Sequence, residues 1–141
     1  MQERPLRILW LIDHVCYDGS LHGGGRLFRN LLPEFDRAQV QVFPYFLRAT
    51  EEIRRVFTDA PVTVLDKGKY NPTTLFTVLN LCRRNKIDVM HLFCYASSTF
   101  GRLVSVLTGI PAIIHDFDTQ IYFPYPFHLK MLDRLLARST R

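Results

Sequence analysis

Residues 6–12 read LRILWLI and lead directly into Asp13, and this stretch decides the fold. Apart from Arg7 the run is apolar, and an apolar run of strand length bounded by charge is typical of a parallel strand buried on both faces. Residues 13–25 are rich in Gly, Asp, His and Ser and predict a loop. Leucine and phenylalanine then recur at helical spacing over residues 26–35, so the chain opens with a strand, a loop and a helix.

The same alternation continues along the chain. Gly109 and Pro111 mark the end of one predicted helix, and Pro72 suits the first turn of another. Five strand-then-helix units predict an α/β fold with a Rossmann-like, doubly wound parallel sheet, which binds ligands beyond the carboxyl ends of its strands. The further predicted strands are 40–47, 62–65, Val89–Phe93 and Ala112–His115, and the further helices are 50–57, 71–86, 97–108 and 125–141.

Composition limits the class of protein. A length of 141 residues with 48% hydrophobic content fits one domain with a real core, and no apolar run approaches the ~20 residues of a membrane span. Residues 1–7 are polar and no signal peptide is expected. Cys16, Cys82 and Cys94 are widely spaced without a CxxC pair, which favours reduced thiols over disulfides or zinc. We therefore expect a cytoplasmic chain.

The chain is basic. Its net charge of +5 and pI near 9.4 favour an acidic partner such as nucleic acid, anionic lipid or a phosphorylated substrate. The aromatic residues lie mostly within apolar runs and do not alternate with basic residues, as a stacking surface for single strands requires. We expect no nucleic-acid partner.

A glycine-rich segment, His22-Gly-Gly-Gly-Arg26, lies between the first strand and the first helix. Its glycines permit positive φ and close backbone approach, and the helix start presents free N–H groups, so the segment is a candidate phosphate cradle. Its spacing matches neither GxGxxG nor the GxxxxGK[ST] loop, so the spacing supports neither a dinucleotide-binding fold nor a P-loop NTPase. A flexible turn is the alternative.

Four segments together resemble the N-terminal domain of GT-B glycosyltransferases, especially the large retaining, family 4-like group that uses nucleotide sugars. They are RILWLID, GGGRLFRNLLPEFD, KIDVMHLF and GIPAIIHD, in that order. The resemblance implies an acceptor-binding domain over residues 1–141, ending before its last strand. It also implies a glycine-rich loop facing the donor phosphates and a separate C-terminal domain, absent here, that holds the nucleotide. The group often has Ala-Glu where this chain has Gly25-Arg26.

The resemblance assigns roles residue by residue. Gly23 and Gly24 match the paired glycines of the group, so their amides, with Gly25 and Arg26 beside them, are the candidate contacts with donor phosphate or acceptor. His115 matches a histidine that ends the fifth strand near the acceptor, and is the candidate catalytic residue. An imidazole at that position opens into the crevice, where it can hydrogen-bond a sugar hydroxyl or move a proton. An exposed loop histidine is the alternative.

Three further residues border the predicted crevice. Asp13 ends the first strand, Tyr95 follows the fourth and Asp116 follows the fifth, and each is a candidate hydrogen-bonding partner of the substrate. Asp116 and Asp118 form a DxD pair, which holds a divalent metal in GT-A enzymes, but the GT-B-like context requires none. We expect no metal site and no cofactor, with the nucleotide sugar as a substrate.

The resemblance thus predicts an acceptor-binding domain of a hexosyltransferase-like enzyme, inactive alone, that moves a glycosyl unit from a nucleotide sugar to a glycan or lipid-linked acceptor. A non-catalytic flavodoxin-like binding or regulatory module is the alternative. The last predicted helix carries Lys130, Arg134 and Arg138 opposite its leucines. It is a candidate peripheral contact with an anionic membrane, or else it packs on the sheet with a solvated basic face.

Overall fold

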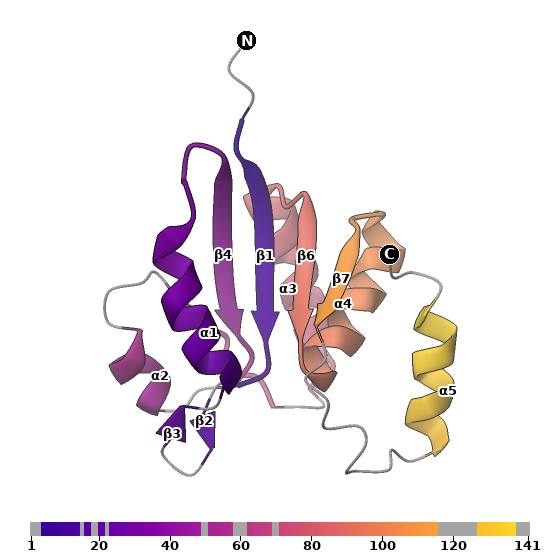
Figure 1. Ribbon diagram of the computed structural model, residues 1–141. Helices are drawn as coiled ribbons and strands as arrows, with labels where there is room; N and C mark the ends of the chain where they lie inside the picture. Colours follow the sequence, from indigo (N-terminus) through magenta and orange to yellow (C-terminus); the bar gives the residue numbers. More distant parts are fainter. Residues whose placement is uncertain are drawn as a thin grey trace.

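The computed structural model describes residues 4–14, 16–17, 20–21, 23–48, 51–57, 62–68, 71–115 and 127–137. At its centre is a parallel five-stranded sheet with strand order β5-β4-β1-β6-β7 (Figure 1). The chain begins in the middle of the sheet and winds outward in both directions, which confirms the predicted Rossmann-like, doubly wound sheet. The strands are β1 (Leu6–Ile12), β4 (Val40–Phe46), β5 (Thr63–Val64), β6 (Val89–Phe93) and β7 (Ala112–His115).

β1 is buried on both faces, as its apolar run predicts. Leu9 and Leu11 pack into one hydrophobic cluster, while Trp10 and Ile12 pack into the other, on the opposite face of the sheet. Each of these four side chains is nearly or completely buried. The sheet therefore divides the core into two layers, and β1 holds them together.

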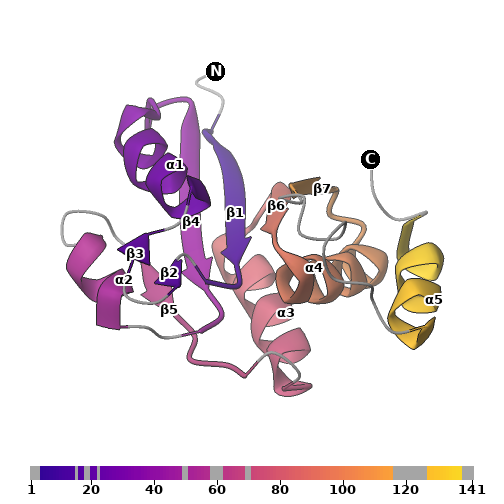
Figure 2. The ribbon, with the colours of Figure 1, turned by 60° about the horizontal axis from the view of Figure 1, so that its bottom comes forward.

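Helices cover both faces of the sheet (Figures 1 and 2). α1 and α2 lie over β1, β4 and β5 on one face, and α3 and α4 lie on the other. α5 packs against α4, away from the sheet. The helices are α1 (Gly23–Leu31), α2 (Glu51–Val56), α3 (Thr73–Asn85), α4 (Tyr95–Thr108) and α5 (Phe127–Leu136), with a 3-10 turn, η1 (Leu32–Glu34), after α1.

The segment between β1 and α1 differs from its prediction. Instead of one loop over 13–25, it contains a short antiparallel hairpin, β2 (Cys16–Tyr17) with β3 (Ser20–Leu21), and α1 begins at Gly23. Glycine disfavours helix by about 1 kcal/mol per residue, so local sequence argues for a later start. Tertiary packing decides otherwise, because Phe28 of α1 is buried against Trp10 and Phe93, at ring distances of 5.3 and 4.4 Å.

α4 begins two residues before its predicted start and ends at its predicted signal. Gly109 has φ 73° and its N–H donates to the Ser105 carbonyl at 2.8 Å, a left-handed cap that glycine adopts without strain. Gly101 lets this helix approach the sheet, since a Cβ at that position would lie 2.9 Å from Leu92 Cγ. The start of α4 lies at the carboxyl end of β6, because Cys94 alone separates the two elements. None of the described helices is long and apolar enough to cross a bilayer.

Candidate functional site

The carboxyl ends of the parallel strands lie along one edge of the sheet, at the bottom of Figure 1 and turned forward in Figure 2. The starts of α1 and α4 and the β2–β3 hairpin lie at the same edge. Doubly wound sheets bind ligands here. The polar and reactive residues that end or follow the strands include Asp13 and His14 after β1, Arg48 after β4, Asp66 and Lys67 after β5, Cys94 and Tyr95 after β6, and His115 at the end of β7.

Asp13 fastens the start of α4 to the end of β1. Its side chain is 2% exposed, and one carboxylate oxygen accepts from the Ala96 N–H at 2.9 Å. The other accepts from the Ser97 N–H at 2.6 Å and from the Ser97 hydroxyl. Burial raises the pKa of Asp13, and the hydrogen bonds from Ser97 and Ala96 oppose that rise. Both oxygens are thus engaged within the protein, which makes Asp13 a positioning residue for α4; its contact with substrate stays a prediction.

Cys94 forms the turn that delivers α4 to Asp13. Its backbone has φ 71° and ψ 178°, a combination that is nearly restricted to glycine. Such strain persists only where surrounding contacts impose it. Here the Asp13 carboxylate fixes the first turn of α4, and β6 fixes the residue before the turn.

The glycine-rich segment lies in the first turn of α1. Gly24 and Gly25 are buried, and Arg26 is exposed. Gly109 is the one glycine with positive φ among the described residues, so Gly23, Gly24 and Gly25 do not use the positive φ that glycine permits; they are helical. The N–H groups of a first helical turn have no partner within the helix, so the segment remains a helix start at the ligand edge.

His115 belongs to a row of aromatic rings on β6 and β7. Its ring stacks on Phe93 at 5.3 Å and lies 5.7 Å from His91, which itself contacts Phe93 at 4.1 Å. Burial, with the nearby His115 as a smaller cause, lowers the pKa of His91 to about 4. His115 is half-buried, so its ring is held at the strand end while part of it reaches solvent.

Of the remaining predicted site residues, Tyr95 is described by the structure and the two aspartates after β7 are not. Tyr95 is the first residue of α4 and is half-buried at the same edge. Asp116 and Asp118 lie outside the described residues. Within the described ranges, no three His, Cys, Asp or Glu side chains gather in a way that could hold a metal ion.

Sequence reasoning missed two residues of this edge, Ser97 and Arg48. Ser97 is the side-chain partner of Asp13 across 84 positions of sequence. The Arg48 N–H donates to the Asp13 carbonyl at 3.1 Å, and its guanidinium Nη2 donates to His14 Nδ1 at 3.2 Å. In the sequence, Ser97 belongs to a serine pair in the first turn of a helix, and Arg48 is a basic residue just after a strand. These local patterns do not show that Ser97 contacts Asp13 or that Arg48 contacts His14.

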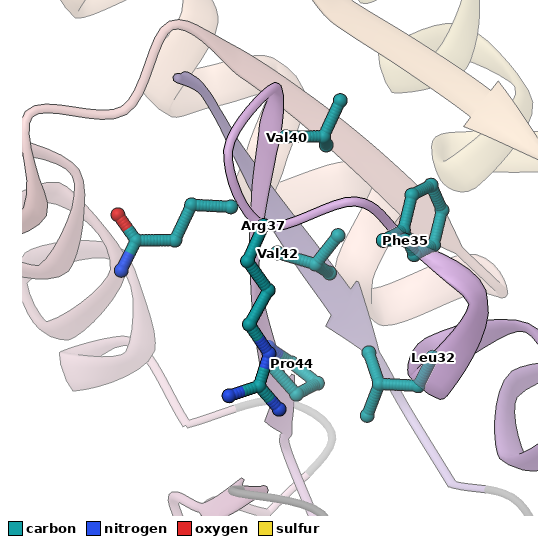
Figure 3. Close-up of a pocket in the computed structure, with 7 residues that line it drawn as sticks. Leu32, Phe35, Arg37, Val40, Val42 and Pro44 are labelled. Atoms are coloured by element: carbon teal, nitrogen blue, oxygen red, sulfur yellow. The ribbon is translucent and has the colours of Figure 1, made fainter. Parts of the chain in front are cut away.

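A pocket of about 130 Å³ lies elsewhere, beside the amino-terminal half of β4 (Figure 3). None of the predicted site residues lines it. It therefore does not coincide with the ligand edge. Its walls come from η1, the turn after it and β4: Leu32, Phe35, Arg37, Val40, Gln41, Val42 and Pro44.

Comparison with solved structures identifies a similar fold. The chain superimposes on the crystal structure of MurG from Acinetobacter baumannii, a GT-B glycosyltransferase, with a TM-score of 0.58 and 18% sequence identity. The match covers 96% of this chain but 39% of that one, so the chain spans well under half of its structural neighbour. No family model matches the sequence, and no curated protein does. The similarity shows a fold like one domain of a GT-B enzyme.

Proposed function

We propose that this chain is the acceptor-binding domain of a nucleotide-sugar-dependent glycosyltransferase. The observation that carries the proposal is the GT-B-like sheet, whose ligand edge collects the start of α1, the fastened start of α4 and His115. The family 4-like motifs of the sequence point to the same class. Donor binding is assigned mainly to a separate domain, as the resemblance implies.

The proposed roles follow from placement. The acceptor hydroxyl oxygen bonds to the anomeric carbon, the bond from that carbon to the donor diphosphate breaks, and the hydroxyl proton is released. His115 hydrogen-bonds the reacting hydroxyl, because a half-buried imidazole at a strand end can accept its proton. The first-turn amides of α1, with Gly23, Gly24 and Gly25, stabilise the charge that develops on the diphosphate. The exposed Arg26 beside them adds positive charge.

Binding measurements on residues 1–141 test the first part of the proposal. Labelled with ¹⁵N, the chain is titrated with a panel of nucleotide sugars and soluble glycan acceptors while amide shifts are followed. We expect saturable shifts at Gly24, Gly25, Tyr95 and His115. If every compound leaves these amides unmoved, the assignment of the edge to sugar transfer is wrong.

Activity tests the second part. In the protein supplied with its donor-binding domain, His115→Ala lowers kcat by about 100-fold, in the range removed with a general base. Ile113→Ala is the matched control, because Ile113 is 48% exposed on the same strand and two residues away. Equal rates for the two variants would rule out a catalytic role for His115. Sugar transfer by residues 1–141 alone would contradict a separate donor domain.

We also propose a cytoplasmic protein that touches an anionic membrane through α5. Phe127, Met131 and Leu135 recur every four residues on this helix and are 78%, 53% and 69% exposed. Arg134 is exposed beside this apolar stripe. Exposed apolar residues next to a basic one are typical of helices that lie at an interface, which suits a lipid-linked acceptor.

A further inference from the structure

Arg48 is a cation held at the ligand edge by contacts that do not neutralise it. It follows β4, and its backbone is fixed by the hydrogen bond to the Asp13 carbonyl at 3.1 Å. Its side chain is half-buried, and the guanidinium donates to His14 Nδ1 at 3.2 Å. Arginine can only donate, so Nδ1 must accept and this contact requires a histidine that carries no proton on that nitrogen.

The described hydrogen bonds of Arg48 use only part of the donor capacity of its guanidinium. Its Nε is shielded from solvent, and no hydrogen-bond acceptor among the described residues reaches it. Neither of the ion pairs Arg4–Asp88 and Arg102–Asp133 involves Arg48, and no carboxylate whose side chain the structure describes forms an ion pair with it. Asp13 attracts it electrostatically, but both Asp13 oxygens accept from α4.

A second cation follows the neighbouring strand. The Lys67 N–H donates to the Leu47 carbonyl at 2.6 Å, which brings Lys67, three residues after the end of β5, beside Leu47, the residue before Arg48. Lys67 Nζ donates to the Thr73 hydroxyl at 3.2 Å, a neutral partner. Two basic residues with neutral hydrogen-bond partners thus follow adjacent strands, at the edge where α1 presents its first turn (Figure 1).

We propose that Arg48 is an anion-binding residue that holds a phosphate group of the ligand, with Lys67 as a secondary cation. A half-buried guanidinium with no carboxylate partner among the described side chains is costly to keep, and its planar fork matches the oxygens of phosphate. The identification of the phosphate as part of a donor diphosphate or of a lipid-linked acceptor rests on the proposed function. The anion site itself stands on the contacts of Arg48.

Calorimetric titration of residues 1–141 with inorganic pyrophosphate tests the site. We expect Arg48→Gln to weaken binding by at least about tenfold, since charge-assisted contacts are lost. Arg48→Lys keeps the charge without the fork and weakens binding less. Arg37→Gln is the matched control, because exposed Arg37 lies just before β4 and Arg48 lies just after it, at opposite ends of one strand.

The outcomes separate the hypotheses. No pyrophosphate binding by the wild type, equal binding by Arg48→Gln, or an equal loss in Arg37→Gln would overturn the proposal. Amide spectra check that each variant is folded. If Arg48→Gln does not fold, the comparison of Arg48→Lys with the wild type tests the site instead. Parallel titrations with a nucleoside diphosphate and with short-chain phosphatidic acid identify the source of the phosphate. Pyrophosphate binding that depends on Arg48, without any sugar-nucleotide or glycan binding, would retain this site and reject the proposed function.

Discussion

At the scale of single residues, His91 links the aromatic row of the site to the stability of the fold. Its pKa falls from 6.5 to about 4 on folding, chiefly because the ring is buried. As the pH drops below 6.5 the unfolded chain binds this proton and the folded chain does not, so the free energy of unfolding decreases between pH 6.5 and about 4.

His91→Phe removes this dependence. Allowing for solvent screening of a half-buried ring, we expect the stability of the wild type relative to the variant to decrease by about 1 kcal/mol across that pH interval. Urea unfolding at a series of pH values measures the difference, and contributions common to both chains cancel. Parallel curves for the two proteins would show that folding does not perturb the His91 pKa.

The strained backbone of Cys94 leads to a second prediction at this scale. Alanine is ordinarily more stable than glycine by about 0.5–1 kcal/mol inside regular structure. At φ 71° and ψ 178° the order should reverse, because glycine adopts this backbone without strain that costs other residues about 1–3 kcal/mol. Thermal unfolding of Cys94→Gly and Cys94→Ala tests the reversal. A more stable alanine variant would mean that the turn between β6 and α4 is relaxed.

At the scale of elements, α5 is attached to α4 through one buried arginine. Arg102 is 5% exposed; its Nε donates to the Ser98 carbonyl at 3.2 Å and its other nitrogens reach the Asp133 carbonyl, at 3.3 Å, and the Asp133 carboxylate. Asp133 is half exposed, so the ion pair is worth less than a buried one. Leu136 of α5 is also buried.

Arg102→Met should therefore loosen α5 without unfolding the sheet. We expect the free energy of local opening of α5 to fall by about 1 kcal/mol, which raises amide hydrogen exchange in this helix several-fold. Hydrogen-exchange mass spectrometry measures it, with β1 as the internal reference. Arg134→Met, at an exposed position on the same helix, is the control, and unchanged exchange of α5 in Arg102→Met would contradict the role assigned to Arg102.

Elements whose structure depends on a local sequence pattern could be predicted from the sequence. The apolar run of β1 and the Gly109–Pro111 helix end depend on local patterns, and the structure confirms both. The start of α1 was not predictable, because burial of Phe28 overrides the helix cost of glycine. In the site, Asp13 and His115 were correctly placed at strand ends. The pairing of Asp13 with Ser97 depends on β1 and β6 being neighbours, which no local pattern encodes.

At the scale of the whole molecule, composition gives the size of the positive charge but not its distribution. The net charge of the chain is +5. The fold brings Arg48 and Lys67 together at the carboxyl edge of the sheet, although 18 residues lie between them in the sequence. It also leaves the apolar stripe of α5 outside the core. A phosphate site and a membrane contact on different parts of one small domain would let it bind a lipid-linked substrate at the bilayer surface.

Vesicle binding tests that arrangement. Replacing Phe127, Met131 and Leu135 together by serine removes three exposed apolar side chains, each contributing about 1 kcal/mol if partly buried in the lipid interface. We expect sedimentation with anionic vesicles to weaken by more than about tenfold. Phe76→Ser is the matched control, because Phe76 is 64% exposed on α3, away from the stripe. Raising the salt concentration should weaken wild-type binding further, since the basic residues are screened. If the triple variant sediments like the wild type, α5 is not the membrane contact and its stripe has another partner.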